Sequence, residues 1–139
     1  MKAEDRKNEQ MFSAETRVYY EDTDAGGIVY YANYLKFMER ARTEWLRSLG
    51  WDQSLLPVLF VVRKVETEYL RPARLDDLLQ VDVSLEARRG AKLVFLQQIK
   101  RAGELLCQAR VEVACVDRSR LRPCRLPASL LATLPGPAN

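Results

Sequence analysis

Apolar side chains recur three and four positions apart between residues 33 and 50, which places them on one face of an amphipathic helix. Asn33 is a suitable N-cap for this helix, and Gly50 suits the position just after its last turn. On the opposite face, Arg40 and Glu44 have the spacing of an exposed ion pair. The pattern predicts one helix of about 25 Å. The residues of its apolar stripe are Tyr34, Phe37, Met38, Ala41, Trp45 and Leu49.

The apolar period changes to two after Gly50, which is typical of strands with one buried face. A first strand is predicted ahead of the helix, from Thr16 to Glu21, where β-branched and aromatic residues gather. Gly90 and Gly103 mark two tight turns further along. The regular alternation of strand and turn favours an antiparallel sheet. The later strands are predicted at Phe60–Leu70, Leu79–Arg88, Leu93–Arg101 and Cys107–Cys115.

These elements predict an α+β fold, in which a five-stranded antiparallel sheet wraps around one long central helix. The helix is expected between the first and second strands. The chain has 139 residues, enough for a single domain with a core of its own. We expect a mobile N-terminal arm over residues 1–14, the domain over residues 15–130 and a flexible tail over residues 131–139.

Composition narrows the class of protein. No apolar run approaches the roughly 18 residues that a membrane span needs, and no signal-peptide pattern follows the polar first ten residues. We therefore expect a cytoplasmic protein without a membrane span. The net charge of +3, from 22 basic and 19 acidic residues, is too balanced for a typical nucleic-acid-binding protein.

The chain contains no histidine, which excludes Ser-His and Cys-His machinery. Its three cysteines, Cys107, Cys115 and Cys124, show no C-x-x-C spacing, so we expect reduced thiols. Neither a metal site nor a redox cofactor is predicted. Any catalytic chemistry is therefore expected to use carboxylates and backbone dipoles.

The segment from Asp22 to Ala32 is the candidate reactive loop. Asp22 and Asp24 lie just ahead of the helix, whose positive end could polarise a substrate carbonyl. A carboxylate at this place can act as nucleophile or general base, although such residues also serve simply as turn or cap residues. We expect Asp22 to brace the loop. Gly26 and Gly27 suit a turn and also let a substrate approach the backbone.

The string Tyr20-Glu-Asp-Thr-Asp-Ala-Gly-Gly-Ile-Val-Tyr-Tyr-Ala-Asn-Tyr34 resembles the hotdog-fold acyl-CoA thioesterases of the 4-hydroxybenzoyl-CoA thioesterase family. Within that family it is most similar to the bacterial YbgC-type branch, which is associated with the Tol–Pal envelope system. The similarity covers roughly residues 17 to 127. It continues through Glu39–Leu46, Phe60–Lys64, Glu68-Tyr69, Pro72–Asp77 and Arg89-Gly90.

The resemblance implies a hotdog fold and hydrolysis of an acyl-CoA thioester to a free acid and CoA. It makes Asp24 the catalytic carboxylate and the backbone N–H of Tyr31 the group that polarises the thioester carbonyl. Tyr31 replaces a histidine that is common in the YbgC-type branch, a change that a backbone role survives. Tyr30 and Tyr31 are expected to form pocket walls, since a phenol with a pKa near 10 is a poor acid at neutral pH.

The resemblance also assigns binding residues and an assembly. Arg88, Arg89 and Lys92 are expected to contact the phosphates of CoA, for which arginine forks are well suited. Family members form homodimers or homotetramers with active sites at the dimer interface, and acyl-carrier protein is an alternative acyl donor. For Glu39, Arg42 and Glu44 we expect a solvated helix face. The rival hypotheses are a non-catalytic hotdog module that binds acyl-carrier protein or another protein, and a small nucleic-acid-binding domain.

Overall fold

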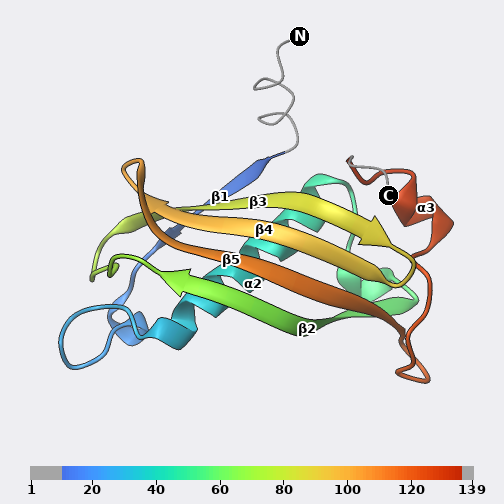
Figure 1. The fold of residues 1–139 in the computed structure, drawn as a ribbon, viewed down its shortest axis with the longest axis horizontal. Helices are drawn as coiled ribbons and strands as arrows, with labels where there is room; N and C mark the ends of the chain where they lie inside the picture. The colour runs from blue at the N-terminus through green and yellow to red at the C-terminus, as the bar shows by residue number, and fades with distance from the viewer. Residues whose placement is uncertain (1–10, 136–139) are drawn as a thin grey trace, which may run out of the picture.

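The computed structural model describes residues 11–135 as a curved sheet with a long helix against its inner face (Figure 1). The five strands form one antiparallel sheet, as predicted, and their order in the sheet is β1-β3-β4-β5-β2. The helix α2 lies between β1 and β2 in the chain. The elements are β1 (Phe12–Arg17), α2 (Tyr31–Ser48), β2 (Val58–Tyr69), β3 (Leu78–Arg89), β4 (Lys92–Arg101), β5 (Glu104–Asp117) and α3 (Ala128–Leu131).

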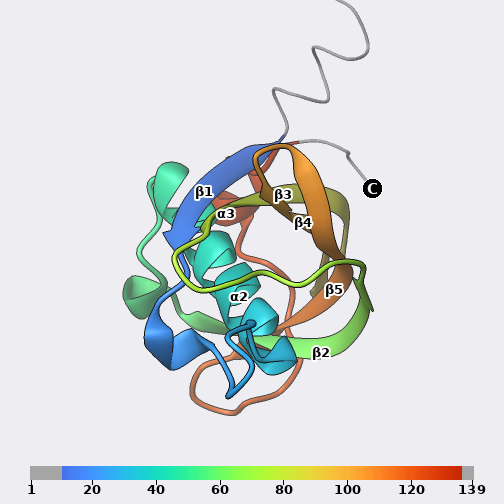
Figure 2. The ribbon, with the colours of Figure 1, turned by 90° about the vertical axis from the view of Figure 1, so that its left-hand side faces the viewer.

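The sheet curls around α2, as the view along the helix shows (Figure 2). The apolar stripe of α2 packs on the inward-facing residues of β3, β4 and β5, where Trp45 meets Phe95 edge to face at 5.2 Å between ring centroids. Alternate residues such as Val81, Val83 and Ile99 are fully buried on the same face. Burial of these side chains supplies the main driving force for the fold.

A buried carboxylate ties the edge strand β1 to the sheet. Asp82 on β3 accepts hydrogen bonds through Oδ1 from Ser13 Oγ at 2.6 Å and from Gln80 Nε2 at 2.8 Å. Its Oδ2 lies 3.1 Å from Lys100 Nζ on β4. Burial alone would raise the pKa of Asp82, but the hydrogen bonds from Ser13 and Gln80 and the ion pair with Lys100 bring it below its usual value.

The first strand differs from its prediction. It begins at Phe12, inside the expected N-terminal arm, and ends at Arg17, while Tyr20–Asp22 forms a 3-10 turn. The β-branched and aromatic residues after Arg17 therefore leave the sheet, and Val18 is buried in the core. Residues 1–10 of the expected arm lie outside the described residues.

The helix begins two residues before the predicted cap. Its N-cap is Tyr30, whose side chain makes no capping hydrogen bond, and Asn33 instead donates through Nδ2 to the carbonyl oxygen of Asp22 at 2.9 Å. The helix ends as predicted, with Gly50 at a φ of +90°, a conformation that favours glycine. The expected pair of Arg40 with Glu44 is replaced by a contact of Glu44 with Arg47.

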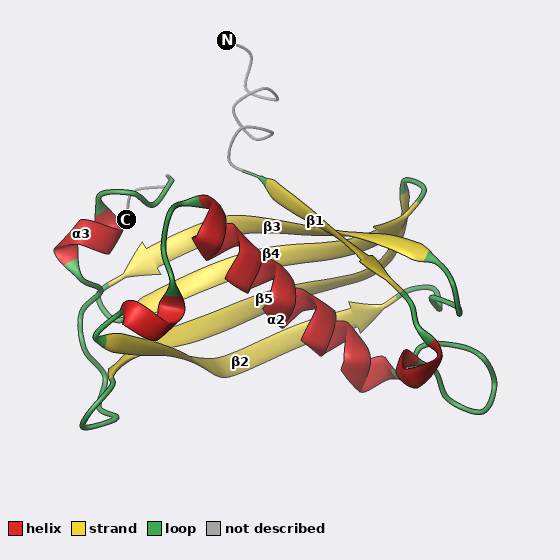
Figure 3. Cartoon of the chain, turned by 180° about the vertical axis from the view of Figure 1, so that it is seen from behind, coloured by secondary structure: helices red, strands yellow, loops and turns green. Residues whose placement is uncertain are grey.

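The C-terminal segment contains an element that the sequence did not predict. The short helix α3 ends at Leu131, and Leu130 and Leu134 are buried against the core (Figure 3). The expected flexible tail over residues 131–139 thus includes packed residues, and residues 136–139 lie outside the described part of the chain. No helix among the described residues has the length and apolar character to cross a membrane.

Candidate functional site

The loop between β1 and α2 is held by Asp22. Its Oδ2 accepts the N–H of Tyr19 at 2.9 Å, and its carbonyl oxygen accepts the N–H of Tyr30 at 3.1 Å and the side chain of Asn33. One residue thus fixes both the start of the loop and the start of α2. This bracing role is the one expected from the sequence.

Asp24 occupies the exposed tip of the same loop. Its backbone N–H donates to the carbonyl oxygen of Ile28 at 2.9 Å, and its Oδ1 accepts the N–H of Gly26 at 2.9 Å. Gly27 has a φ of +78°, and a Cβ on Gly26 would lie 3.4 Å from Asp24 Oδ1. The two glycines therefore let the chain turn back close to the carboxylate, which stays accessible to a ligand.

The start of α2 presents two backbone donors with no acceptor. Among the described residues, no backbone or side-chain oxygen accepts the N–H of Tyr31 or of Ala32. These orphan groups carry the positive end of the dipole of an 18-residue helix. The family resemblance pointed to the N–H of Tyr31 but not to that of Ala32. The first N–H groups of any helix lack intrahelical partners, and this rule would have predicted the donor of Ala32.

Tyrosine side chains surround this helix start. The rings of Tyr30 and Tyr31 lie 4.8 Å apart, and Tyr69 at the end of β2 lies 6.0 Å from Tyr31 and 5.4 Å from Tyr34. Tyr34 is buried, and its hydroxyl accepts the N–H of Ala73 at 2.9 Å. Burial raises the pKa of the Tyr34 and Tyr69 phenols above 10, so neither phenol is suited to act as an acid at neutral pH.

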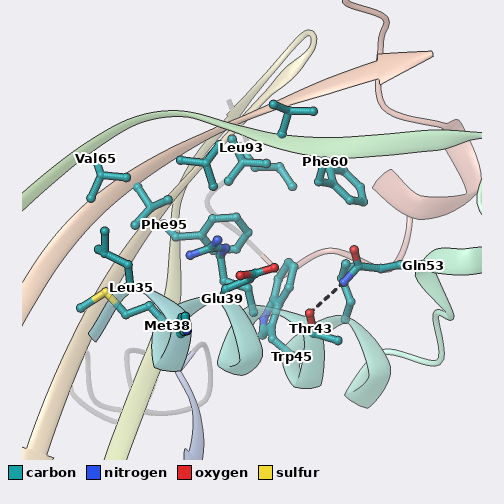
Figure 4. A pocket seen from close by; sticks show the side chains of 17 residues that line it. Leu35, Met38, Glu39, Thr43, Trp45, Gln53, Phe60, Val65, Leu93 and Phe95 are labelled. Carbon is teal, nitrogen blue, oxygen red and sulfur yellow. Dashed lines mark hydrogen bonds between the residues drawn. The ribbon is translucent and has the colours of Figure 1, made fainter. Parts of the chain in front are cut away.

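A cavity of about 540 Å³ lies between α2 and the inner face of β2, β4 and β5 (Figure 4). Glu39 points from α2 into this space, and Thr43 accepts a hydrogen bond from Gln53 at its far end. Arg42 also lines the cavity and donates to Gln97 on β4. The expectation of a solvated helix face was wrong for Arg42, because this side chain folds back beneath the sheet.

The hairpin between β3 and β4 and the loop between β1 and α2 lie at opposite ends of the folded molecule (Figure 1). The loop pairs with the residues just before β3, where Val29 N–H donates to Ala73 and Ile28 bridges Arg74. The cations of the hairpin lie at the far end of β3, about 36 Å along the strand, because Arg88 and Arg89 are its last two residues and Lys92 begins β4. The structure therefore does not bring Asp24 together with Arg88, Arg89 and Lys92 of the same chain.

The three cationic side chains of the hairpin differ in whether hydrogen bonds or ion pairs within the chain already engage them. Arg88 donates through Nη1 to the carbonyl oxygen of Leu131 on α3 at 2.8 Å, and Lys92 lies 3.7 Å from Glu112. Arg89 is exposed, and its side chain makes no hydrogen bond or ion pair with a described residue. Of the three, Arg89 is the cation most available to an anionic ligand.

Comparison with known proteins places these features in a family context. The thioesterase-like superfamily matches residues 18–134. The acyl-CoA thioester hydrolase YbgC of Escherichia coli is 50% identical over 129 residues, which cover 90% of this chain and 96% of that protein. The acyl-CoA thioesterase YbgC of Haemophilus influenzae is 46% identical over 87% of this chain and 92% of its own length.

Solved structures agree with the fold. A probable thioesterase from Bartonella henselae superposes with a TM-score of 0.81 at 37% identity, covering 84% of this chain and 99% of the other. A 4-hydroxybenzoyl-CoA thioesterase complexed with 4-hydroxybenzoyl-CoA gives a TM-score of 0.82 at 19% identity, covering 91% and 99%. These likenesses confirm the predicted hotdog fold.

Proposed function

The chain belongs to the thioesterase-like superfamily, and from this premise we propose that it hydrolyses acyl-CoA thioesters to a free acid and CoA. The observation that carries the proposal is the accessible carboxylate of Asp24 on the loop that leads directly to the unpaired N–H groups of Tyr31 and Ala32. In the absence of histidine, a carboxylate can supply the base or nucleophile for thioester hydrolysis, and a pair of backbone donors can stabilise the oxyanion.

The two backbone donors would hold the thioester carbonyl oxygen and stabilise its negative charge as the carbonyl carbon is attacked. Asp24 then acts in one of two ways. As a nucleophile, it forms a mixed anhydride while the C–S bond breaks, CoA leaves as a thiolate, and water cleaves the anhydride. As a general base, it takes a proton from the water that attacks the carbonyl directly. Single turnover in ¹⁸O-water labels Asp24 only if the first route is followed and water attacks the aspartyl carbon of the anhydride.

The decisive experiment measures release of free CoA thiol from a panel of acyl-CoA substrates. We expect Asp24→Asn to lower kcat by at least about a hundredfold, the scale of a lost general base or nucleophile. Glu21→Gln is the matched control, since it removes an exposed carboxylate from the same segment. Wild-type turnover in Asp24→Asn, with the fold intact by circular dichroism, would overturn the assignment.

We infer a homodimer, because the hairpin and the loop, which together would form the site, lie far apart in one chain. The strand β2 is a free edge of the sheet, and its Val61 and Val62 are 47% and 45% exposed. Such edges invite pairing, and antiparallel pairing of two β2 strands about a twofold axis reverses the second chain. The partner's hairpin would then lie at the same end as the loop that carries Asp24. This arrangement supports CoA phosphate binding by Arg88, Arg89 and Lys92 across the interface. In the proposed homotetramer, two such dimers would pair again.

The remaining parts of the proposal concern the donor and the compartment. Acyl-CoA is the substrate we assign, and acyl-carrier protein is an alternative donor of the same acyl group. We place the protein in the cytoplasm. Its Cys107, Cys115 and Cys124 are unpaired thiols, which fits a reducing compartment.

A further inference from the structure

The cavity between α2 and the sheet combines an apolar wall with a small charged floor. Its sheet side is formed by side chains such as Phe60, Leu93 and Phe95, which Figure 4 shows facing the helix across the empty space. The charged residues of its lining are Lys36, Glu39 and Arg42, all on α2. Two cations and one carboxylate leave this lining with one net positive charge.

Arg42 is held in place but not neutralised by direct contact. Its Nη1 donates to Gln97 Oε1 at 2.8 Å, while Gln97 Nε2 donates to the carbonyl oxygen of Met38 at 3.0 Å. Gln97 is only 1% exposed, so the pair is a fixed part of the cavity wall. No carboxylate of the described residues lies within 4.0 Å of the Arg42 guanidinium, although Glu39 acts on it from further away.

This guanidinium has binding capacity to spare. Of its five N–H donors, one is used by Gln97, and the others donate to no described residue. Burial lowers the pKa of Arg42, but an arginine remains charged at any physiological pH. The guanidinium of Arg42 contacts no carboxylate of the described residues and lies in an apolar cavity. It is therefore well matched to a carboxylate of a ligand and poorly matched to a methyl group.

We propose that the cavity binds an acyl group whose far end carries a carboxylate, and that Arg42 is the residue that selects it. The proposal rests on the thioesterase function and specifies its substrate class as the CoA monothioesters of dicarboxylic acids. A methyl-ended acyl chain would fill the apolar part of the cavity but would leave the charge of Arg42 without a partner.

The length of the helix limits the acyl chain. Arg42 follows Tyr31 by eleven residues, which corresponds to about 16 Å along the helix axis. The arginine side chain leans toward the helix N-terminus and shortens the gap to the donors of Tyr31 and Ala32. An acyl chain of intermediate length is therefore needed, because an acetyl group at the donors would not reach the guanidinium.

The test compares acyl-CoA pairs of equal length on the full-length protein. The carboxylate-ended substrates are glutaryl-, adipoyl- and suberoyl-CoA, and the methyl-ended ones are pentanoyl-, hexanoyl- and octanoyl-CoA. We expect kcat/KM to be at least tenfold higher for the carboxylate-ended member of one or more pairs. If the methyl-ended member is the better substrate in all three pairs, the proposal fails while the thioesterase function stands.

Two variants and one binding measurement complete the test. Arg42→Met should remove the preference, whereas Arg40→Met, which deletes an exposed arginine of the same helix outside the cavity, should retain it. An unchanged preference in Arg42→Met would also overturn the proposal. Calorimetric titration of the wild-type protein with adipate and with hexanoate makes the same comparison without turnover or a variant. Tighter binding of adipate without hydrolysis of any thioester would refute the thioesterase function and keep the cavity assignment.

Discussion

At the scale of single residues, the groups proposed to polarise the substrate belong to the backbone, so only a change of backbone can remove them. Proline is tolerated at the first position of a helix, where its missing N–H had no intrahelical acceptor. Tyr30 has φ −62° and ψ 130°, the extended conformation that the residue before a proline requires. We expect Tyr31→Pro to fold normally and to lower kcat by about 10²- to 10³-fold, the effect of losing one oxyanion donor.

Tyr31→Phe is the companion variant, because it alters the side chain and keeps the N–H. It should retain most of the wild-type kcat in the same thiol-release assay. Equal and large losses in both variants would show that the phenol, and not the backbone, performs the chemistry. Comparable thermal unfolding of the two proteins would establish that the difference is catalytic.

The reactive loop could be read from the sequence because its features are local. Asp24, the glycines that follow it and the start of a helix stand within a few residues of one another, so their proximity in space follows from their order. Arg42 could not be read in this way. Its place on α2 borders the apolar stripe, four residues after Met38, and only the sheet that covers the stripe decides whether so long a side chain turns inward or outward.

At the scale of elements, Asp82 joins three strands and makes their stability depend on pH. The pKa of Asp82 is lower in the folded protein than in the unfolded chain, so its contribution is present above the unfolded pKa of about 3.9 and is lost as the pH falls through the folded value. We expect Asp82→Asn to lower the free energy of unfolding by about 1–3 kcal/mol at pH 7. Urea unfolding at pH 7 and near pH 2 measures the change.

The difference between Asp82→Asn and the wild-type protein should become smaller toward pH 2, because the wild-type carboxyl group loses its charge as the pH falls through its folded pKa. Glu15→Gln serves as the control, since it removes an exposed carboxylate from the same edge strand β1. A loss of the same size at both pH values would mean that the charge of Asp82 is not what holds β1.

The predicted elements were most accurate where the pattern was long and periodic. The strands β3 and β4 and their hairpin fall within one residue of their predicted bounds, because alternation and a turn glycine agree there. The first strand was misplaced, since the aromatic residues after Arg17 have strand propensity but serve a 3-10 turn braced by Asp22. The helix start was misplaced because Asn33, although a good cap, bonds to the loop instead.

At the scale of the whole molecule, the free edge of β2 predicts self-association. We expect a dimer in sedimentation experiments at micromolar concentration, and a monomer for Val62→Lys, since a lysine blunts a sheet edge. Leu96→Lys is the control, because Leu96 is 42% exposed but lies on the central strand β4. A fully active monomer would refute both the dimer and the shared site.

The exposed Arg89 offers a separate test of that shared site. We expect Arg89→Ala to raise KM for acyl-CoA more than it lowers kcat, because phosphate contacts are made in the ground state and the transition state alike. An acyl-pantetheine thioester, which lacks the nucleotide, should be hydrolysed equally well by both proteins. Equal losses on the two substrates would show that Arg89 has a structural role.

The length of β3 has a genetic consequence. The hairpin and the reactive loop stand at opposite ends of the folded chain, so each site of the proposed dimer would take its loop from one chain and its hairpin from the other. A chain lacking Asp24 and a chain lacking Arg89, when paired, would form one site with both defects and one site with neither. Two alleles that are each impaired alone would then complement each other within a single cell, and each mixed dimer would carry half of the wild-type number of intact sites.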